Sequence, residues 1–116
     1  MPEAFAFGPQ GLDRRRVTQC ALSRVCGGCG ESLGRPVAFV GTGLEADRNA
    51  FHVPPLHAGC VEGVLAAYRG EVVDTDLGGG WVVLTTSGFE YVRPSGESVD
   101  RRAVFSPNSV IDRREA

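Results

Sequence analysis

The chain has 116 residues, of which 42% are hydrophobic, and a formal net charge of −2 at pH 7. This length allows one domain, or one domain with an appendage, around a core of modest size. The acidic total argues against a general nucleic-acid binder, because such binding depends on neutralising phosphates with an excess of cationic side chains. No apolar stretch reaches the roughly 18 residues of a membrane span, and the N-terminus lacks the basic and apolar regions of a signal peptide. We therefore expect a soluble, cytoplasmic protein.

The N-terminal third is expected to hold one helix. Residues 1–11 show no helical period and are interpreted as a short strand or a loosely tethered arm. Asp13 is a suitable N-cap, and apolar residues then recur at spacings of three and four, which predicts a helix over 13–24. Cys20 lies on the apolar face of this helix, so we interpret it as a small buried hydrophobe.

Two ligand pairs follow, Cys26-Gly27-Gly28-Cys29 and His57-Ala58-Gly59-Cys60. Side chains separated by two residues can converge on one ion where the backbone turns tightly, and the glycines permit such a turn. We predict one structural Zn²⁺ per chain, bound by Cys26, Cys29, His57 and Cys60. Four protein ligands complete a tetrahedron and leave no position for a catalytic water.

The cysteines allow two other interpretations. Four cysteines could form two disulfides in a small secreted domain, but the missing signal peptide favours a reducing compartment. A redox Cys-x-x-Cys should follow a strand and open a helix, whereas the turn-prone residues 30–34 come after Cys29. The metal interpretation is preferred over both.

The pattern around these pairs predicts a small α+β zinc domain over 12–70. Residues 35–41 and 50–53 are predicted strands of a β-hairpin, joined by 42–49 with one helical turn at most. Pro54 and Pro55 end the second strand. A helix then starts at the second ligand pair, with an apolar stripe at 61, 64, 65 and 68 and Gly70 just beyond its end. The order of knuckle, hairpin and helix is that of a treble clef.

The C-terminal part is predicted to add a second β-hairpin. Residues 81–86 and 89–94 have strand composition and flank Ser87-Gly88, which predicts a turn. Residues 71–106 would form this extension, with a further strand at 103–105, and 107–116 a flexible tail. Trp81, Phe89 and Tyr91 form the candidate interaction surface, because aromatic residues are enriched at interfaces.

Residues 26–68 resemble a group of short, mostly uncharacterised zinc-binding proteins of actinobacteria and their phages. The resemblance rests on the motif at 25–30, on Leu33-Gly34, Phe39-Val40, Asn49 and Pro54-Pro55, and on 57–60 followed by an alanine-rich helix. It implies a treble-clef-like zinc domain and no particular activity.

These observations favour a non-catalytic zinc module that acts as a protein-interaction adaptor or regulator. The alternative is a nucleic-acid-binding zinc-finger regulator, in which the arginines at 14–16, 101–102 and 113–114 converge. A second alternative is a metal-dependent enzyme with His52 as acid or base, although the zinc-deaminase signature is missing. His52 is otherwise expected to lie in a strand or to border the ligands.

Overall fold

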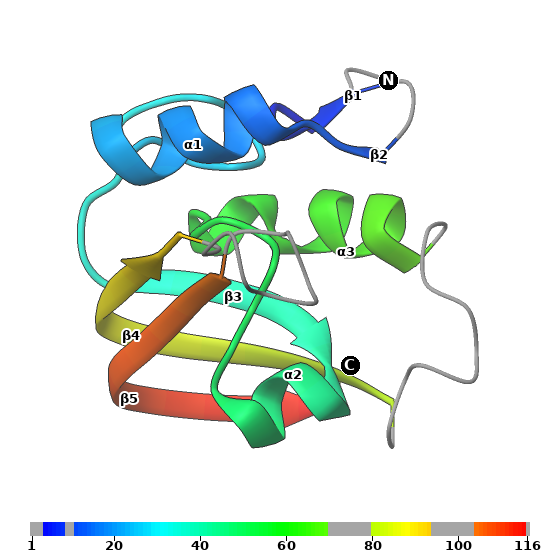
Figure 1. The fold of residues 1–116 in the computed structure, drawn as a ribbon. Helices are drawn as coiled ribbons and strands as arrows, with labels where there is room; N and C mark the ends of the chain where they lie inside the picture. Colours follow the sequence, from blue (N-terminus) through cyan, green and yellow to red (C-terminus); the bar gives the residue numbers. More distant parts are fainter. Residues whose placement is uncertain (1–3, 9–10, 70–79, 94–103, 116) are drawn as a thin grey trace.

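The computed structural model describes residues 4–8, 11–69, 80–93 and 104–115 as a small α+β protein (Figure 1). Its largest unit is an antiparallel sheet with the strand order β3-β4-β5, and β1 pairs with β2 separately. The view in Figure 1 shows helix α1 above α3 and α3 above the sheet, so α3 forms a middle layer. The elements in chain order are β1 (Phe7–Gly8), β2 (Gly11–Leu12), α1 (Arg14–Ser23), β3 (Val37–Thr42), α2 (Gly43–Arg48), the 3-10 turn η1 (Ala58–Cys60), α3 (Val61–Arg69), β4 (Trp81–Val92) and β5 (Val104–Glu115).

The sheet is closed into a ring by the segment 51–56. At one end of this segment Phe51 exchanges both backbone hydrogen bonds with Phe105 of β5, at 2.8 and 2.7 Å. At the other end Leu56 exchanges both with Ala38 of β3, each at 2.8 Å. Phe39, Phe51 and Phe105 are fully buried in the core, and the ring of Phe39 lies 5.6 Å from that of Phe51 and 6.3 Å from that of Phe105. This closure satisfies backbone groups that an open sheet edge would leave unpaired.

The predicted N-terminal helix is confirmed, and its cap is Asp13. The Asp13 carboxylate accepts hydrogen bonds from the backbone N–H groups of Arg15 and Arg16, which have no partner inside the helix. Val17 and Cys20 are buried on its inner face.

Of the two predictions for residues 1–11, the short strand is confirmed as β1, and the described residues before α1 are held against the Cys26 turn. The N–H groups of Phe5 and Ala6 donate to the carbonyls of Gly28 and Gly27, each at 2.9 Å. Arg16 donates from its guanidinium to the carbonyls of Phe5 and Phe7. The turn that carries the first ligand pair is therefore braced from its N-terminal side.

The predicted hairpin between the ligand pairs is wrong, because β3 pairs with β4 and 50–53 forms no strand. Within the predicted connection, Gly43–Arg48 form helix α2, which Thr42 and Glu45 cap with a capping box. The buried Glu45 carboxylate also accepts from the backbone N–H of His52 at 3.0 Å. The His52 N–H therefore bonds to a side chain and not to a neighbouring strand. Between β5 and β3, the segment 51–56 makes only the two backbone bridges described above, at Phe51 and at Leu56. A treble clef is not confirmed.

The second predicted hairpin is also wrong. Residues 81–92 form one continuous strand, β4, which pairs with β3 over Trp81–Thr86 and with β5 along its length. Gly88 does not adopt the positive φ that a tight hairpin turn uses, and it lies opposite Asn108. The supposed flexible tail forms β5, which confirms a strand at 104–105 and extends it to Glu115. Residues 70–79, Ala103 and the proposed helix end at Gly70 lie outside the described residues.

The predicted helix after the second ligand pair is confirmed as η1 and α3, with Val61, Val64, Leu65 and Tyr68 buried. Tyr68 donates its hydroxyl to both Glu45 oxygens, at 3.1 and 3.2 Å, which ties α3 to α2. No helix in the described ranges is both long and apolar enough to cross a membrane.

Candidate metal centre

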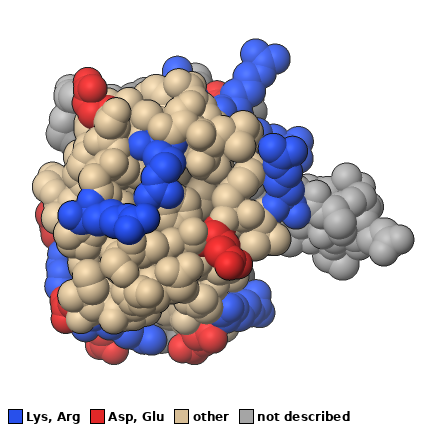
Figure 2. All heavy atoms as spheres, turned by 90° about the vertical axis from the view of Figure 1, so that its left-hand side faces the viewer, with Lys and Arg blue, Asp and Glu red and all other residues tan. Residues whose placement is uncertain are grey.

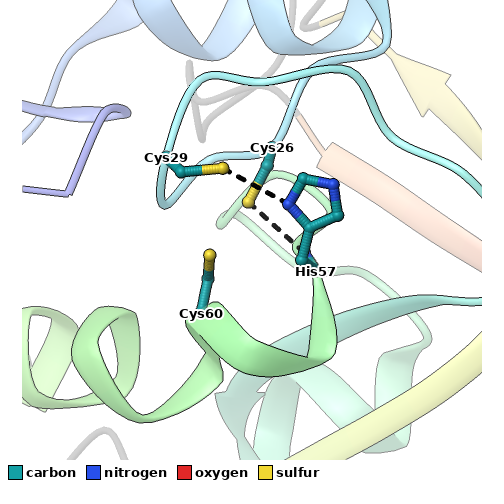
Figure 3. Close-up of side chains that lie close together, drawn as sticks. All are labelled: Cys26, Cys29, His57 and Cys60. Atoms are coloured by element: carbon teal, nitrogen blue, oxygen red, sulfur yellow. Dashed lines mark hydrogen bonds between the residues drawn. The ribbon is translucent and has the colours of Figure 1, made fainter.

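The four predicted ligands converge on one point. Cys26 and Cys29 lie on the turn that follows α1, while His57 precedes η1 and Cys60 ends it. Their ligand atoms all lie within 4.8 Å of one another, and Figure 3 shows three sulfur atoms and the His57 ring turned toward a common centre. All four cysteines of the chain are free thiols. Such a Cys₃His group could hold a metal ion.

Cys26 is the innermost ligand. Its side chain is fully buried, and its sulfur accepts from the backbone N–H groups of Gly28 at 3.2 Å and His57 at 3.3 Å. Burial alone would raise the pKa of this thiol, but the backbone N–H groups of His57, Cys29 and Gly28 outweigh burial and lower the pKa. The backbone of both ligand pairs thus favours a thiolate at Cys26.

Cys60 shows the opposite electrostatic effect. Burial, followed by hydrogen bonding and repulsion from Cys26 and Cys29, raises the pKa of the Cys60 thiol to about 12. Three sulfurs this close cannot all ionise without a compensating cation. A divalent cation among them removes this penalty, because a coordinating thiol is deprotonated by the ion. The crowding of thiols therefore fits a cation site.

His57 is oriented by the backbone of the loop after Cys29. Its Nε2 atom lies 2.8 Å from the carbonyl oxygen of Ser32, and its Nδ1 atom lies 3.3 Å from the sulfur of Cys29. Because a carbonyl can only accept a hydrogen bond, Nε2 carries the proton and Nδ1 presents a lone pair to the cluster. Hydrogen bonding of the outer ring nitrogen in this way is typical of metal-binding histidines.

Gly28 allows the two ligand pairs to approach each other. A Cβ atom at this position would lie 2.7 Å from the Cβ and 3.2 Å from the sulfur of Cys60. Real Cβ atoms do not approach another carbon so closely, so any larger residue would push the turn away from α3. Glycine is therefore required by close contact with the second ligand pair.

The other cysteine and histidine do not belong to the cluster. Cys20 is fully buried, as predicted, and burial together with the nearby Cys26 raises the pKa of its thiol to about 12. His52 is absent from the ligand group found among the described residues, and its backbone N–H is bound by Glu45.

Ser32 is the contributor that the sequence did not reveal. It acts through its backbone carbonyl, and every residue type supplies that group, so no side-chain pattern marks it. The sequence could have indicated only that some acceptor is needed, since a histidine ligand usually donates a hydrogen bond from its second ring nitrogen.

The three aromatics of the predicted interaction surface are half-buried and do not form one patch. Phe89 and Tyr91 pack on Phe105, with ring centroids 6.0 and 5.3 Å away. Trp81 lies at the opposite end of β4, where its ring is 5.5 Å from that of Tyr68. An arginine covers each ring: Arg69 over Trp81, Arg24 over Phe89 and Arg93 over Tyr91.

The arginines proposed to bind nucleic acid are partly engaged within the protein. Arg16 holds the N-terminal segment, and Arg114 lies 3.4 Å from the Glu62 carboxylate. Arg101 and Arg102 lie outside the described residues. On the face shown in Figure 2, arginines stand in small groups among uncharged residues and carboxylates, without one continuous basic surface.

Comparison with protein-family models, curated proteins and solved structures found no match to this chain. What is established is a small α+β protein with a Cys₃His cluster suited to a metal ion. Its function must be inferred from that cluster and its surroundings.

Proposed function

We propose that this protein is a zinc-binding module whose metal is structural. The observation that carries the proposal is the convergence of four protein donors, three sulfurs and one correctly oriented imidazole nitrogen, within 4.8 Å. Soft thiolates with imidazole select zinc among the common divalent ions, and four protein ligands complete its preferred tetrahedron. Calcium and magnesium prefer oxygen ligands.

The position of the cluster explains what such a metal does for the fold. Cys26 and Cys29 belong to the turn that the N-terminal segment braces, whereas His57 and Cys60 start the helix that packs on the sheet. Outside the cluster, the backbone link between the two pairs is a single hydrogen bond from the Gly27 N–H to the Pro55 carbonyl, at 3.0 Å, among those described for this turn. A metal ion would add four strong bonds at this junction, and its binding energy counts as folding energy.

Metal analysis of the natively purified protein tests this proposal. We expect one zinc per chain, retained through gel filtration, and loss of most of it in Cys60→Ala. The matched control is Cys20→Ala, which removes a buried thiol outside the cluster and should keep the zinc. Zinc-free native protein, or equal zinc loss in both variants, would contradict a site made of these ligands.

We further propose that the module acts by binding another protein, through the surface formed by Phe89, Tyr91 and their covering arginines, Arg24 and Arg93. Tyr, Phe and Arg are the residue types enriched at protein interfaces. Trp81 lies apart from this surface.

Affinity capture with charge-reversal variants tests the proposed surface without truncating side chains that pack in the core. Arg24→Glu combined with Arg93→Glu changes the outer groups and leaves Phe89 and Tyr91 in place. Arg48→Glu combined with Arg15→Glu, at two exposed helix positions, changes the net charge by the same amount and is the control. A partner lost by the double variant and kept by the control supports the surface, whereas identical partner sets in all three proteins reject it.

A further inference from the structure

We propose that Cys29 is a site of oxidative modification, at which a hydroperoxide starts the conversion of Cys26 and Cys29 into a disulfide and the release of the metal. This inference rests on the proposed zinc site, since it concerns the regulation of that site. It is carried by the unequal exposure of the three cysteine residues and by the short distances between their sulfurs.

The three cysteine ligands differ in their access to solvent. Cys29 is exposed, Cys60 is half-buried and Cys26 is fully buried. A metal-bound thiolate remains nucleophilic, and oxidation of thiolates follows exposure. A small oxidant arriving from solvent therefore meets the Cys29 sulfur first.

The distances allow the oxidised sulfur to be captured at once. All ligand atoms lie within 4.8 Å, so the Cys26 sulfur is a near neighbour of the Cys29 sulfur. The two cysteines share one turn and are separated only by Gly27 and Gly28. Cys60 is held on a different element, at the end of η1.

The chemistry balances with hydrogen peroxide as oxidant. The Cys29 thiolate attacks one peroxide oxygen, the O–O bond breaks, and hydroxide leaves as the sulfur becomes a sulfenic acid. The Cys26 thiolate then attacks the Cys29 sulfur, an S–S bond forms, and a second hydroxide leaves. Two protons from solvent convert the hydroxides to water. Two thiolates are oxidised, one peroxide is reduced, and the metal loses two of its four ligands.

A disulfide inside the turn would separate the two ligand pairs. His57 and Cys60 would lose the metal that connects them to Cys26 and Cys29, while the Gly27–Pro55 and His57–Ser32 hydrogen bonds would remain between the segments. The modification would thus loosen the junction between the N-terminal third and α3. A reducing thiol would reverse it by exchange.

The test uses the zinc-loaded full chain, whose zinc content is measured first. Hydrogen peroxide below one equivalent is added with a dimedone-type trap for sulfenic acids, and the modified peptides are identified by mass spectrometry. Parallel samples without trap receive excess peroxide and a chromogenic zinc chelator. We expect the trap on Cys29, a Cys26–Cys29 disulfide, two thiols lost per zinc released, and recovery after dithiothreitol and zinc.

Two variants sharpen the test. Cys29→His keeps a zinc-binding donor without a thiol and should release zinc at least about tenfold more slowly, since the two remaining cysteines of the cluster are less exposed than Cys29. Cys20→Ala should respond as the unmodified protein does. If Cys29→His does not hold zinc, the trapping experiment on the unmodified chain decides.

The outcomes separate this inference from the zinc proposal. Protein that holds zinc and keeps it with all thiols intact under excess peroxide overturns the modification site alone. Trapping on Cys60 or Cys26 before Cys29 also overturns it. Protein without zinc before oxidant is added overturns both.

Discussion

One backbone carbonyl determines which atom of His57 can bind a metal. The Ser32 oxygen accepts from Nε2 and thereby directs the Nδ1 lone pair toward the three sulfurs. The Cys26 sulfur is also positioned by the backbone, because the N–H groups of Gly28 and His57 donate hydrogen bonds to it. At the scale of single residues, hydrogen bonds from the main chain orient the side chains that would bind the metal.

His57→Ala should therefore weaken zinc binding by more than about tenfold and lower the melting temperature, because it removes one of four ligands. His52→Ala should affect both far less, because His52 lies outside the ligand group and the substitution keeps the backbone N–H that donates to Glu45. Zinc competition with a chelator and thermal unfolding, with and without chelator, measure the two effects. Equal losses, or a larger loss for His52→Ala, would contradict the ligand assignment.

Gly28→Ala should weaken zinc binding although it removes no ligand. The new Cβ atom would lie 2.7 Å from the Cβ atom of Cys60, so the turn and the start of the helix must move apart. Gly59→Ala is the matched control, because a Cβ there has no neighbour within 4 Å. We expect a loss of zinc affinity of about tenfold for Gly28→Ala and little change for Gly59→Ala. Unchanged affinity in Gly28→Ala would contradict the close approach seen here.

The ligand set was predictable because its signal is local. Each pair needs only a two-residue spacing, and the exclusion of Cys20 followed from its place on a helix face. The partners around the ligands were not predictable, because Ser32 and Gly28 act through a carbonyl and through the lack of a side chain. Their roles depend on the distance between segments that are far apart in sequence.

At the scale of elements, local patterns located the helices and the strand residues of β3 and β4, but they did not predict how the strands pair. Asp13 and the apolar periodicity located α1 and α3 correctly. Ser87-Gly88 was predicted as a turn from composition, yet pairing with β5 extends β4 through it. The exposed residues of β5 are polar from Asp112 onward, so they resemble a tail. Strand partners are set by tertiary contacts, which local propensity does not contain.

Phe105→Ala tests the closure of the sheet by β5. Phe105 is fully buried, packs against Phe39, Phe89 and Tyr91, and exchanges two backbone hydrogen bonds with Phe51. Its truncation should lower the free energy of unfolding by about 3–5 kcal/mol. Val110→Ala on the same strand, at a side chain that is 54% exposed, should change it by less than about 0.5 kcal/mol. Urea unfolding of both variants gives the comparison, and a small loss for Phe105→Ala would argue against the closed ring.

At the scale of the whole molecule, the Cys₃His cluster and the sheet share one hydrophobic core. Cys26 and Val17 belong to the same buried cluster as Phe39 and Phe105. Aromatic contacts run from Phe7 to Tyr68 and on to Trp81, which links the N-terminal segment to the far end of β4. A domain with one core of this size is expected to unfold as a unit. Loss of metal should therefore destabilise parts of the protein that lie far from the ligands.

The single tryptophan, Trp81, offers a way to measure this coupling. It packs on Tyr68 and under Arg69 and belongs to neither ligand pair. If the protein unfolds as one unit, thermal unfolding followed by Trp81 fluorescence and by far-ultraviolet circular dichroism should give the same midpoint, and a chelator should lower both together. Above the dissociation constant, each tenfold rise in free zinc adds about 1.4 kcal/mol of stability, or roughly 5 °C. A chelator that removes the zinc and leaves the Trp81 transition in place would instead show that the sheet folds independently of the metal. Cys20→Ala, which keeps the four ligands, should follow the zinc dependence of the unmodified chain from a lower starting midpoint.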